Sequence, residues 1–251
     1  MTTDPAAAAG PSRRERVRDA TLAEIKSTAR RHLVASGAAA LSLRAVAREM
    51  GLTAPALYRY VDSREDLLTE VIADLYGELT DALEAARDAQ PLDEIGWRLV
   101  AASWALRSWA LENPTEFGLV FGDPLPGYAK PAEGVSQAAS RRFGMVFAEL
   151  FAQLWAQRPF PHPATDELDP GLCDQLAAYA RAMNSPLPPG AVKVFLDCWI
   201  RLYGLVCMEV FGHLRFVLDD GEAMFADMMR ANALALGFPE DQAAETLGWR
   251  P

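Results

Sequence analysis

The stretch from Ser42 to Arg64, SLRAVAREMGLTAPALYRYVDSR, constrains the fold more than any other part of the chain. Its first half has apolar residues at the i, i+3, i+4, i+7 spacing of one helix face, namely Leu43, Val46, Ala47 and Met50. Ser42 is placed as an N-cap whose hydroxyl accepts from first-turn amides. Gly51 can enter the left-handed conformation that ends a helix. The pattern predicts a short helix followed by a tight chain reversal.

A second short helix is expected directly after this reversal. Thr53 can cap it, and Pro55 lies in its first turn, where a missing N–H is tolerated. Leu57 and Val61 face the preceding helix, so a Tyr-Arg-Tyr surface remains outside. Two helices joined in this way are typical of a DNA-binding helix-turn-helix. An ordinary hairpin of two core helices is the alternative, but apolar residues would then occupy that outer surface.

The longer segment LSLRAVAREMGLTAPALYRYVDSREDLL resembles the DNA-binding signature of the TetR family of one-component repressors. The matching parts are Ser-x-Arg, Ala-x-x-x-Gly, Leu-Tyr followed by a polar aromatic residue, a basic residue and Leu-Leu. The resemblance covers Ala20 to Leu83. Tyr60-Val61 stands where His-Phe is usual, and Arg64 stands where Lys is usual. Both differences keep the chemical type of the side chain, a polar aromatic residue and a cation. They leave the preferred DNA sequence open.

The resemblance also implies which side chains contact DNA. Ser42 would donate to a phosphate, Arg44 would reach a guanine edge or a phosphate, and Arg64 would bind the sugar-phosphate backbone. The tyrosines would bond phosphates, and the small residues at the start of the second helix would make methyl and backbone contacts. The expected DNA-binding residues are Ser42, Arg44, Thr53, Ala54, Pro55, Ala56, Tyr58, Arg59, Tyr60 and Arg64.

The charge distribution agrees with a DNA-binding N-terminal part. The net charge of the 251 residues is −10. Residues 1–64 hold 11 Lys or Arg and 6 Asp or Glu, a net +5, which leaves −15 for residues 65–251. A basic part attracts phosphates, whereas an acidic part repels them and orients the approach.

Three regions are expected along the chain. Residues 1–18 are rich in Ala, Gly and Pro and end in SRRERVR, which predicts a disordered basic arm that either contacts DNA or is a solvated tail. A helix near Asp19 to Ser36 completes a helix-turn-helix domain over 19–64. Residues 65–251 then form a helical ligand-binding and dimerisation domain, and a helix over 63–87 links the two.

The third region shows helical periodicity and no strand pattern, so the whole protein is predicted to be all-α. Apart from the linking helix, the expected helices and loops alternate along the chain. The helices are near 93–112, 114–121, 133–157, 171–182, 189–214 and 220–236, and the main loops are at 122–131 and 158–170.

Aromatic residues in this region indicate either a plain core or a ligand pocket. Pockets are mostly apolar and aromatic with a few polar groups. The pieces ENPTEFGLVFG (112–122) and Trp199…Tyr203-Gly204 resemble the ligand domain of one TetR subgroup. We expect an apolar or aromatic small-molecule effector and no cofactor. The candidate ligand-binding residues are Trp104, Asn113, Phe121, Phe147, Phe151, Trp155, Cys198, Trp199 and Tyr203.

The last two long helices are the expected dimer interface. The helix over 189–214 has apolar residues on two faces, and both must be covered. Central burial within one subunit is the alternative. A two-fold dimer would place two recognition helices in successive major grooves of a near-palindromic operator. The candidate interface residues are Val192, Leu196, Tyr203, Val206, Val210, Phe225 and Met229.

Other classes of function find little support in the sequence. No GxSxG, P-loop, Rossmann or HExxH motif occurs, so we expect no enzyme. Three dispersed histidines and three cysteines without a CxxC pair predict no metal site, and a cysteine redox sensor is the weaker alternative to buried thiols. No membrane span or signal peptide is recognisable, which predicts a cytoplasmic protein. The expected function is a ligand-released repressor; a helix-turn-helix protein without an effector is the alternative.

Overall fold

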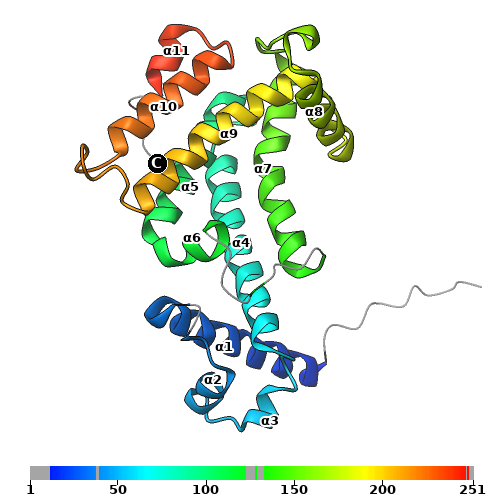
Figure 1. Cartoon of the computed structure of the whole chain (residues 1–251), viewed down its shortest axis with the longest axis vertical. Helices are drawn as coiled ribbons and strands as arrows, with labels where there is room; N and C mark the ends of the chain where they lie inside the picture. The colour runs from blue at the N-terminus through cyan, green and yellow to red at the C-terminus, as the bar shows by residue number, and fades with distance from the viewer. Residues whose placement is uncertain (1–11, 38–39, 123–127, 129–132, 247, 249–251) are drawn as a thin grey trace, which may run out of the picture. The chain divides into compact units, whose positions relative to one another are not determined.

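The computed structural model describes residues 12–37, 40–122, 128, 133–246 and 248. Every regular element in this part of the chain is a helix, which confirms the all-α prediction (Figure 1). The chain divides into a first unit, residues 1–75 with 118–137, and a second unit, residues 76–117 with 138–251. The disorder expected for residues 1–11, and most of the loop expected at 122–131, lie outside the described residues.

Helix α1 (Arg13–Ser36) begins six residues earlier than the sequence analysis placed it. The Ser12 hydroxyl accepts from the amide of Glu15 at 3.2 Å, and the Glu15 carboxylate accepts from the amide of Ser12 at 2.6 Å. This reciprocal capping box satisfies two amides at the start of the helix. The basic segment from Arg13 to Arg18 is therefore helical, which corrects the expectation of a disordered arm there.

Helices α2 (Leu43–Glu49) and α3 (Ala54–Leu57) follow α1 in the first unit (Figure 1). They pack with α1 around a core of fully buried side chains, which includes Ile25, Leu33, Val46 and Leu57. These are the apolar positions that helical spacing puts on one face of each helix. The first unit thus contains the three-helix arrangement that the sequence predicts.

Helix α4 (Arg64–Asp88) is continuous and begins in the first unit. The Ser63 hydroxyl accepts from the amide of Asp66 at 2.9 Å and so caps the first turn. Acidic Glu65 and Asp66 lie at this end, where the helix dipole favours negative charge. In the chain, the boundary between the two units lies between Leu75 and Tyr76, within this helix.

The remaining helices lie within a few residues of their expected bounds, with one addition at the C-terminal end. Helix α9 ends at Val210 rather than Leu214, because Gly212 has φ +71° and the amide of His213 donates back to the carbonyl of Met208 at 2.8 Å. The helices are α5 (Ile95–Glu112), α6 (Pro114–Phe121), α7 (Val135–Gln157), α8 (Pro170–Ala182), α9 (Pro189–Val210), α10 (Glu222–Ala235) and the unexpected α11 (Glu240–Glu245).

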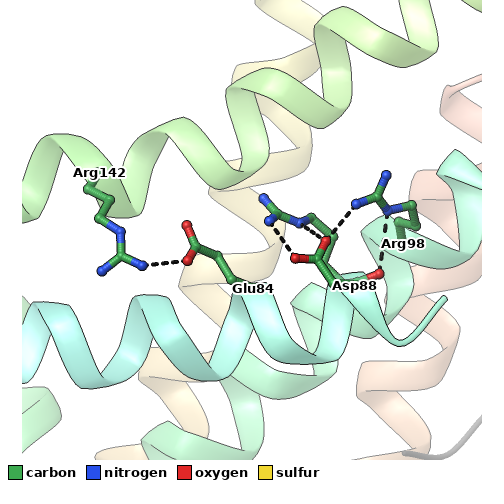
Figure 2. A network of polar contacts seen from close by, with 5 residues as sticks. Glu84, Asp88, Arg98 and Arg142 are labelled. Carbon is green, nitrogen blue, oxygen red and sulfur yellow. Dashed lines mark hydrogen bonds and ion pairs between the residues drawn. The ribbon is translucent and has the colours of Figure 1, made fainter. Parts of the chain in front are cut away.

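A polar network joins three helices of the second unit (Figure 2). Arg142 of α7 contacts Asp81, at 2.8 Å, and Glu84 on α4. Arg98 of α5 donates to Asp88 near the end of α4 at 2.7 Å. The hydrogen bond from neighbouring Arg87, and then that from Arg98, hold the pKa of the Asp88 carboxyl below its usual range. The last turns of α4 are thereby tied to both α5 and α7.

Candidate nucleic-acid interface and a pocket in the second unit

The turn between α2 and α3 has the geometry that its residues predict. Gly51 has φ +66°, and the amide of Leu52 donates to the carbonyl of Ala47 at 2.8 Å, which closes the end of α2. The Thr53 hydroxyl accepts from the amide of Ala56 at 3.3 Å and caps α3. Ser42 stands at the N-cap of α2 but makes no side-chain capping bond, which corrects that detail of the expectation.

The side chains expected at the DNA lie together on the helix-turn-helix of the first unit. Leu57 and Val61 are buried beneath them, as expected. Tyr58 is 50% exposed, although it directly follows buried Leu57. The exposed members of the set are Arg44, Thr53, Pro55, Tyr58 and Arg59, and the half-buried members are Ser42, Ala54, Ala56, Tyr60 and Arg64.

Arg64 differs from the other members because its guanidinium is already bonded within the first unit. Its Nε donates to the carbonyl of Leu41 at 3.2 Å, just before α2, and its Nη1 lies 3.2 Å from the Glu65 carboxylate. The side chain is only 25% exposed. Arg64 therefore holds the start of α4 to the chain that enters α2, in addition to any contact with a phosphate.

A second polar clamp orients α2 against α1. The Glu49 carboxylate accepts from Arg31 at 2.7 Å and lies 2.6 Å from the Nε2 of His32. The hydrogen bonds from Arg31 and then His32 hold the pKa of the Glu49 carboxyl below its ordinary value. His32 thus has a structural partner at the end of α2.

The second unit contains a pocket of about 290 Å³. Side chains from α5, α7, α9, α10 and α11 line it. Four of the nine candidate ligand-binding residues are among them: Phe147, Phe151, Cys198 and Trp199. They come from α7 and α9, where aromatic residues recur at helical spacing. The pocket therefore brings together three of the candidate aromatic rings and the candidate thiol.

The other five candidates lie elsewhere. Trp104 is buried against Phe225, with ring centroids 4.8 Å apart. Trp155 contacts Phe160, and Tyr203 stacks on the pocket residue Trp199 at 5.5 Å. The Asn113 amide donates to the carbonyl of Trp109 at 2.9 Å at the end of α5, and Phe121 belongs to the first unit. None of these five lines the pocket.

Several pocket residues were missed by the sequence analysis, above all Trp97, Phe195, Asn232 and Phe238. Phe238 lies between α10 and α11, where the Arg158 guanidinium stands 4.3 Å from its ring centroid. A Cβ at Gly96 would come within 2.9 Å of the Cζ at the tip of this ring. Pro239 followed by two acidic residues is typical of a helix start and could have indicated α11.

The polar groups of the pocket are few and mostly engaged. The Ser103 hydroxyl donates to the carbonyl of Leu99 at 2.8 Å, and the Asn232 Oδ1 accepts from Arg201 at 3.0 Å. Burial raises the pKa of the Cys198 thiol to about 11, so this group is neutral at physiological pH. Glu94 and Glu245 are the charged members, and no Lys, Arg or His is among the described lining residues.

The residues expected at a dimer interface divide into two groups. Val192, Val206, Phe225 and Met229 are buried inside the second unit, with at most 5% exposure. Their side chains already pack in the subunit core, which corrects their assignment to an intersubunit surface. Leu196 is exposed, and Tyr203 and Val210 are half-buried.

Other apolar side chains of α9 are exposed instead. Ile200 is 57% exposed, Met208 41%, and Phe211, directly after the helix, 45%. With Leu196 they recur at helical spacing around Gly204, where open space surrounds the position that a Cβ would take. Helix α9 therefore has an exposed apolar face, but this face is formed by Leu196, Ile200, Met208 and Phe211 rather than by the predicted Val192 and Val206.

Within the described ranges, no group of three or more His, Cys, Asp or Glu side chains could hold a metal ion. None of the described helices combines the length and apolarity that crossing a membrane requires.

Comparison with known proteins agrees with both units. Residues 25–71 match the family described as bacterial regulatory proteins, tetR family, and residues 99–232 match the tetracyclin repressor-like C-terminal domain. The chain is 34% identical over 211 residues to the HTH-type transcriptional regulators Rv1816 of Mycobacterium tuberculosis and Mb1846 of Mycobacterium bovis, covering 80% of this chain and 85% of each relative.

Solved structures show the same fold. The crystal structure of SCO4313 is similar with a TM-score of 0.71 and 31% identity, over 88% of this chain and 98% of that one. RolR, crystallised with resorcinol, is similar in fold at a TM-score of 0.52 and 17% identity, over 94% of this chain and 96% of that one. The helix-turn-helix geometry, the two matching domains and these relatives together show that the chain belongs to the TetR family of DNA-binding transcriptional regulators.

Proposed function

We propose that this regulator is a ligand-responsive repressor, which binds a near-palindromic operator as a homodimer and is released when a mostly apolar small molecule enters the second unit. The observation that carries the proposal is the pocket of about 290 Å³ in that unit, lined by aromatic rings of α5, α7 and α9. A cavity of this size is close to the lower end of ligand pockets, and well above the voids of a packed core. We assign the protein no catalytic role and a cytoplasmic location.

The lining supports an uncharged or cationic effector. Rings such as Trp97, Phe147 and Trp199 offer apolar surface and π-faces, and the charged residues among the described lining, Glu94 and Glu245, are carboxylates. No cation is among the described lining residues, so the burial of an anionic ligand there would be costly. RolR, a protein of the same fold, was crystallised with resorcinol, a small aromatic diol. That complex makes uncharged phenols reasonable first probes.

The proposed dimer uses the exposed face of α9 rather than its buried one. Leu196, Ile200, Met208 and Phe211 form an apolar stripe, and Gly204 in its centre permits close approach of a second helix. Exposed apolar stripes of this kind are typical of protein interfaces. Replacement of Ile200 by Asp is expected to convert the dimer to monomer in sedimentation experiments and to weaken operator binding. An unchanged mass would contradict the assignment of this face.

The proposed DNA contacts come from the exposed side chains of the helix-turn-helix. Arg44 projects from the first turn of α2, whereas Arg59 and Tyr58 project from the end of α3. Arginine reads guanine edges in the major groove, and tyrosine hydroxyls bond phosphates. Thr53, Ala54, Pro55 and Ala56 form the end of the recognition helix that would enter the groove first.

The ligand would act by favouring one of two arrangements of the dimer. It can shift that equilibrium only as far as its affinities for the two arrangements differ. The candidate link is α4, which starts beside the helix-turn-helix and whose end is bonded by Arg98 of α5 (Figure 2). Because α5 also lines the pocket, a ligand that moves α5 would move the end of α4.

A DNA-binding titration tests the proposal. A fluorescent duplex from the gene's own upstream region is titrated at several salt concentrations with the wild type, Arg44→Ala and, as a control, Arg181→Ala. Arg181 is an exposed arginine of α8 in the second unit. We expect tight binding that weakens with salt, a loss with Arg44→Ala and no change with Arg181→Ala. Equal loss for both variants would indicate a charge effect only.

The effector part is tested in the same assay. Phenols, anilines and lipophilic amines are added to the preformed complex, and their binding to the free protein is followed by thermal shift. Release of DNA by compounds that also raise the unfolding temperature is the expected result. Binding of DNA that no such compound relieves, together with no thermal shift, would favour a helix-turn-helix regulator without an effector.

A further inference from the structure

A second hollow lies next to the pocket in the second unit. It measures about 150 Å³ and is lined by α7, the end of α8, the segment 183–187 and the start of α9. Its walls include the flexible side chains of Met145 and Met183, which can adapt to an occupant.

The two hollows share two lining residues, Phe151 of α7 and Phe195 of α9. Their rings meet edge to face, with centroids 4.9 Å apart and an interplanar angle of 71°. This ring pair therefore forms the wall that separates the two spaces. Phe151 is buried and also meets Phe160, whereas Phe195 is only half-buried and stacks on the exposed ring of Tyr179. Phe195 is accordingly the ring with more freedom to turn aside.

We propose that the two hollows are the two ends of one elongated ligand site, and that the Phe151–Phe195 pair is the partition that a long ligand must pass. This inference rests on the proposed effector function and names its ligand class. The ligand carries a ring that occupies the larger pocket and an unbranched apolar chain that passes the partition into the smaller hollow. Together the two volumes fall within the usual range of ligand pockets, whereas the larger one alone is at its lower end.

The chemistry of the two ends agrees with this assignment. The larger pocket offers ring surfaces for stacking together with the Cys198 thiol and the Ser103 hydroxyl. The smaller hollow is lined mainly by aliphatic and aromatic side chains and by Met145 and Met183, with Glu149, Asn184 and Ser185 as its polar members. The apolar majority of this lining suits an alkyl chain. A chain that enters gains about fourfold in affinity for each methylene that it buries.

The test is a chain-length series measured without DNA. Phenol and 4-alkylphenols from methyl to heptyl are titrated by calorimetry into the wild type, Phe195→Ala, Phe195→Leu and Phe195→Trp. In the wild type, affinity is expected to rise steadily with chain length beyond the propyl compound. Phe195→Ala and Phe195→Leu, which lack the ring, should bind the longer compounds at least tenfold more tightly than the wild type does. In Phe195→Trp the larger ring should block the partition, so that affinity stops rising after the short-chain compounds.

Phe160→Leu is the matched control. Phe160 touches Phe151 and is buried, but it lines neither hollow, so its removal disturbs the same cluster without opening the partition. This variant should keep the wild-type dependence on chain length. Circular dichroism and thermal unfolding establish that each variant is folded, and the leucine and tryptophan variants retain the test if the alanine variant is not.

The experiment distinguishes a failure of the proposed partition from a failure of the proposed effector pocket. If phenol and the short compounds bind but all four Phe195 forms show the same dependence on chain length, the partition is refuted and the effector pocket stands. If no phenol of any length binds any folded form, the single elongated site is refuted and the pocket loses its main support as an effector site.

Discussion

Arg107 of α5 and Glu209 of α9 are joined by two hydrogen bonds, Nε to Oε2 and Nη2 to Oε1, both 2.8 Å long. Their side chains are only 10% and 6% exposed. The guanidinium also lies over the rings of Trp104 and Phe225, at 5.4 and 5.3 Å. Gly221 completes the site, since a Cβ there would lie 2.0 Å from Glu209. A buried, planar ion pair thus connects two helices that both line the pocket.

Removal of one partner is expected to be costly. Glu209→Ala or Arg107→Ala leaves a charge buried without its counterpart, which lowers the free energy of unfolding by about 3–5 kcal/mol. The double variant Arg107→Met with Glu209→Leu should lose much less, because no charge is left buried. Urea unfolding of the three variants measures both effects. Single and double variants of equal stability would contradict a buried pair of this kind.

A tight backbone contact at the start of α9 gives a second prediction. A Cβ at Gly190 would lie 2.1 Å from the carbonyl oxygen of Pro163 and 2.6 Å from the ring of His162. Because a backbone atom is in the way, Gly190→Ala should destabilise the protein by about 1–3 kcal/mol. Gly144→Ala on α7 is the control, where open space surrounds the position and alanine should stabilise by about 0.5–1 kcal/mol. Urea unfolding that gives both variants the same sign of change would contradict this contact.

Local patterns in the sequence predicted the helix-turn-helix well, because its signals are local. Gly51 must adopt a positive φ, Thr53 caps the next turn, and Leu57 with Val61 repeats at the spacing of a buried face. The earlier start of α1 could also have been predicted from the sequence. Ser12 and Glu15 form a Ser-x-x-Glu capping box, and this signature is readable from four residues.

The pocket and the exposed apolar face of α9 could not be predicted in the same way. Periodicity identifies which residues of a helix are apolar, but it does not say which of two apolar faces meets the subunit core. Val206 and Ile200 lie on the same helix with similar chemistry, yet one is buried and the other 57% exposed. Phe238 reaches the pocket through a loop whose position depends on Arg158, a residue far away in the chain. Such choices are decided by packing between distant segments.

The buried thiol of Cys198 predicts a dependence of stability on pH. Burial raises its pKa from 9.0 to about 11, since the thiolate is poorly solvated there. Below pH 9 the thiol is neutral in both folded and unfolded chains and has no effect. Between pH 9 and 11 only the unfolded chain loses the proton, so stability falls, by on the order of 2–3 kcal/mol in total. Urea unfolding across this range should show a steeper decline for the wild type than for Cys198→Ala.

The comparison isolates one thiol, because Cys207 and Tyr203, whose pKa values burial also raises, are present in both proteins. The same burial predicts that Cys198 reacts slowly with iodoacetamide at pH 8, and more slowly still with a ligand in the pocket. Parallel pH profiles for the two proteins would show that the thiol does not lose its solvation on folding.

Arg64 should reveal two roles that different measurements separate. Its Nε bond to the carbonyl of Leu41 holds the start of α4 to the segment before α2, and its charge lies in the part expected at the DNA backbone. Arg64→Ala should lower the free energy of unfolding by about 1–2 kcal/mol. It should also weaken binding to all duplexes alike and reduce the slope of log K against log salt by about 0.9 for each phosphate that the arginine neutralises.

Arg64→Lys distinguishes these roles, because it keeps the positive charge and removes the Nε donor. The lysine variant should recover the wild-type salt slope while it keeps most of the loss of stability. Arg44→Ala should show the opposite behaviour, with unchanged stability and about 1–3 kcal/mol less binding to the operator but not to unrelated duplexes. If Arg64→Lys and Arg64→Ala have the same salt slope, Arg64 holds the fold of the first unit and binds no phosphate.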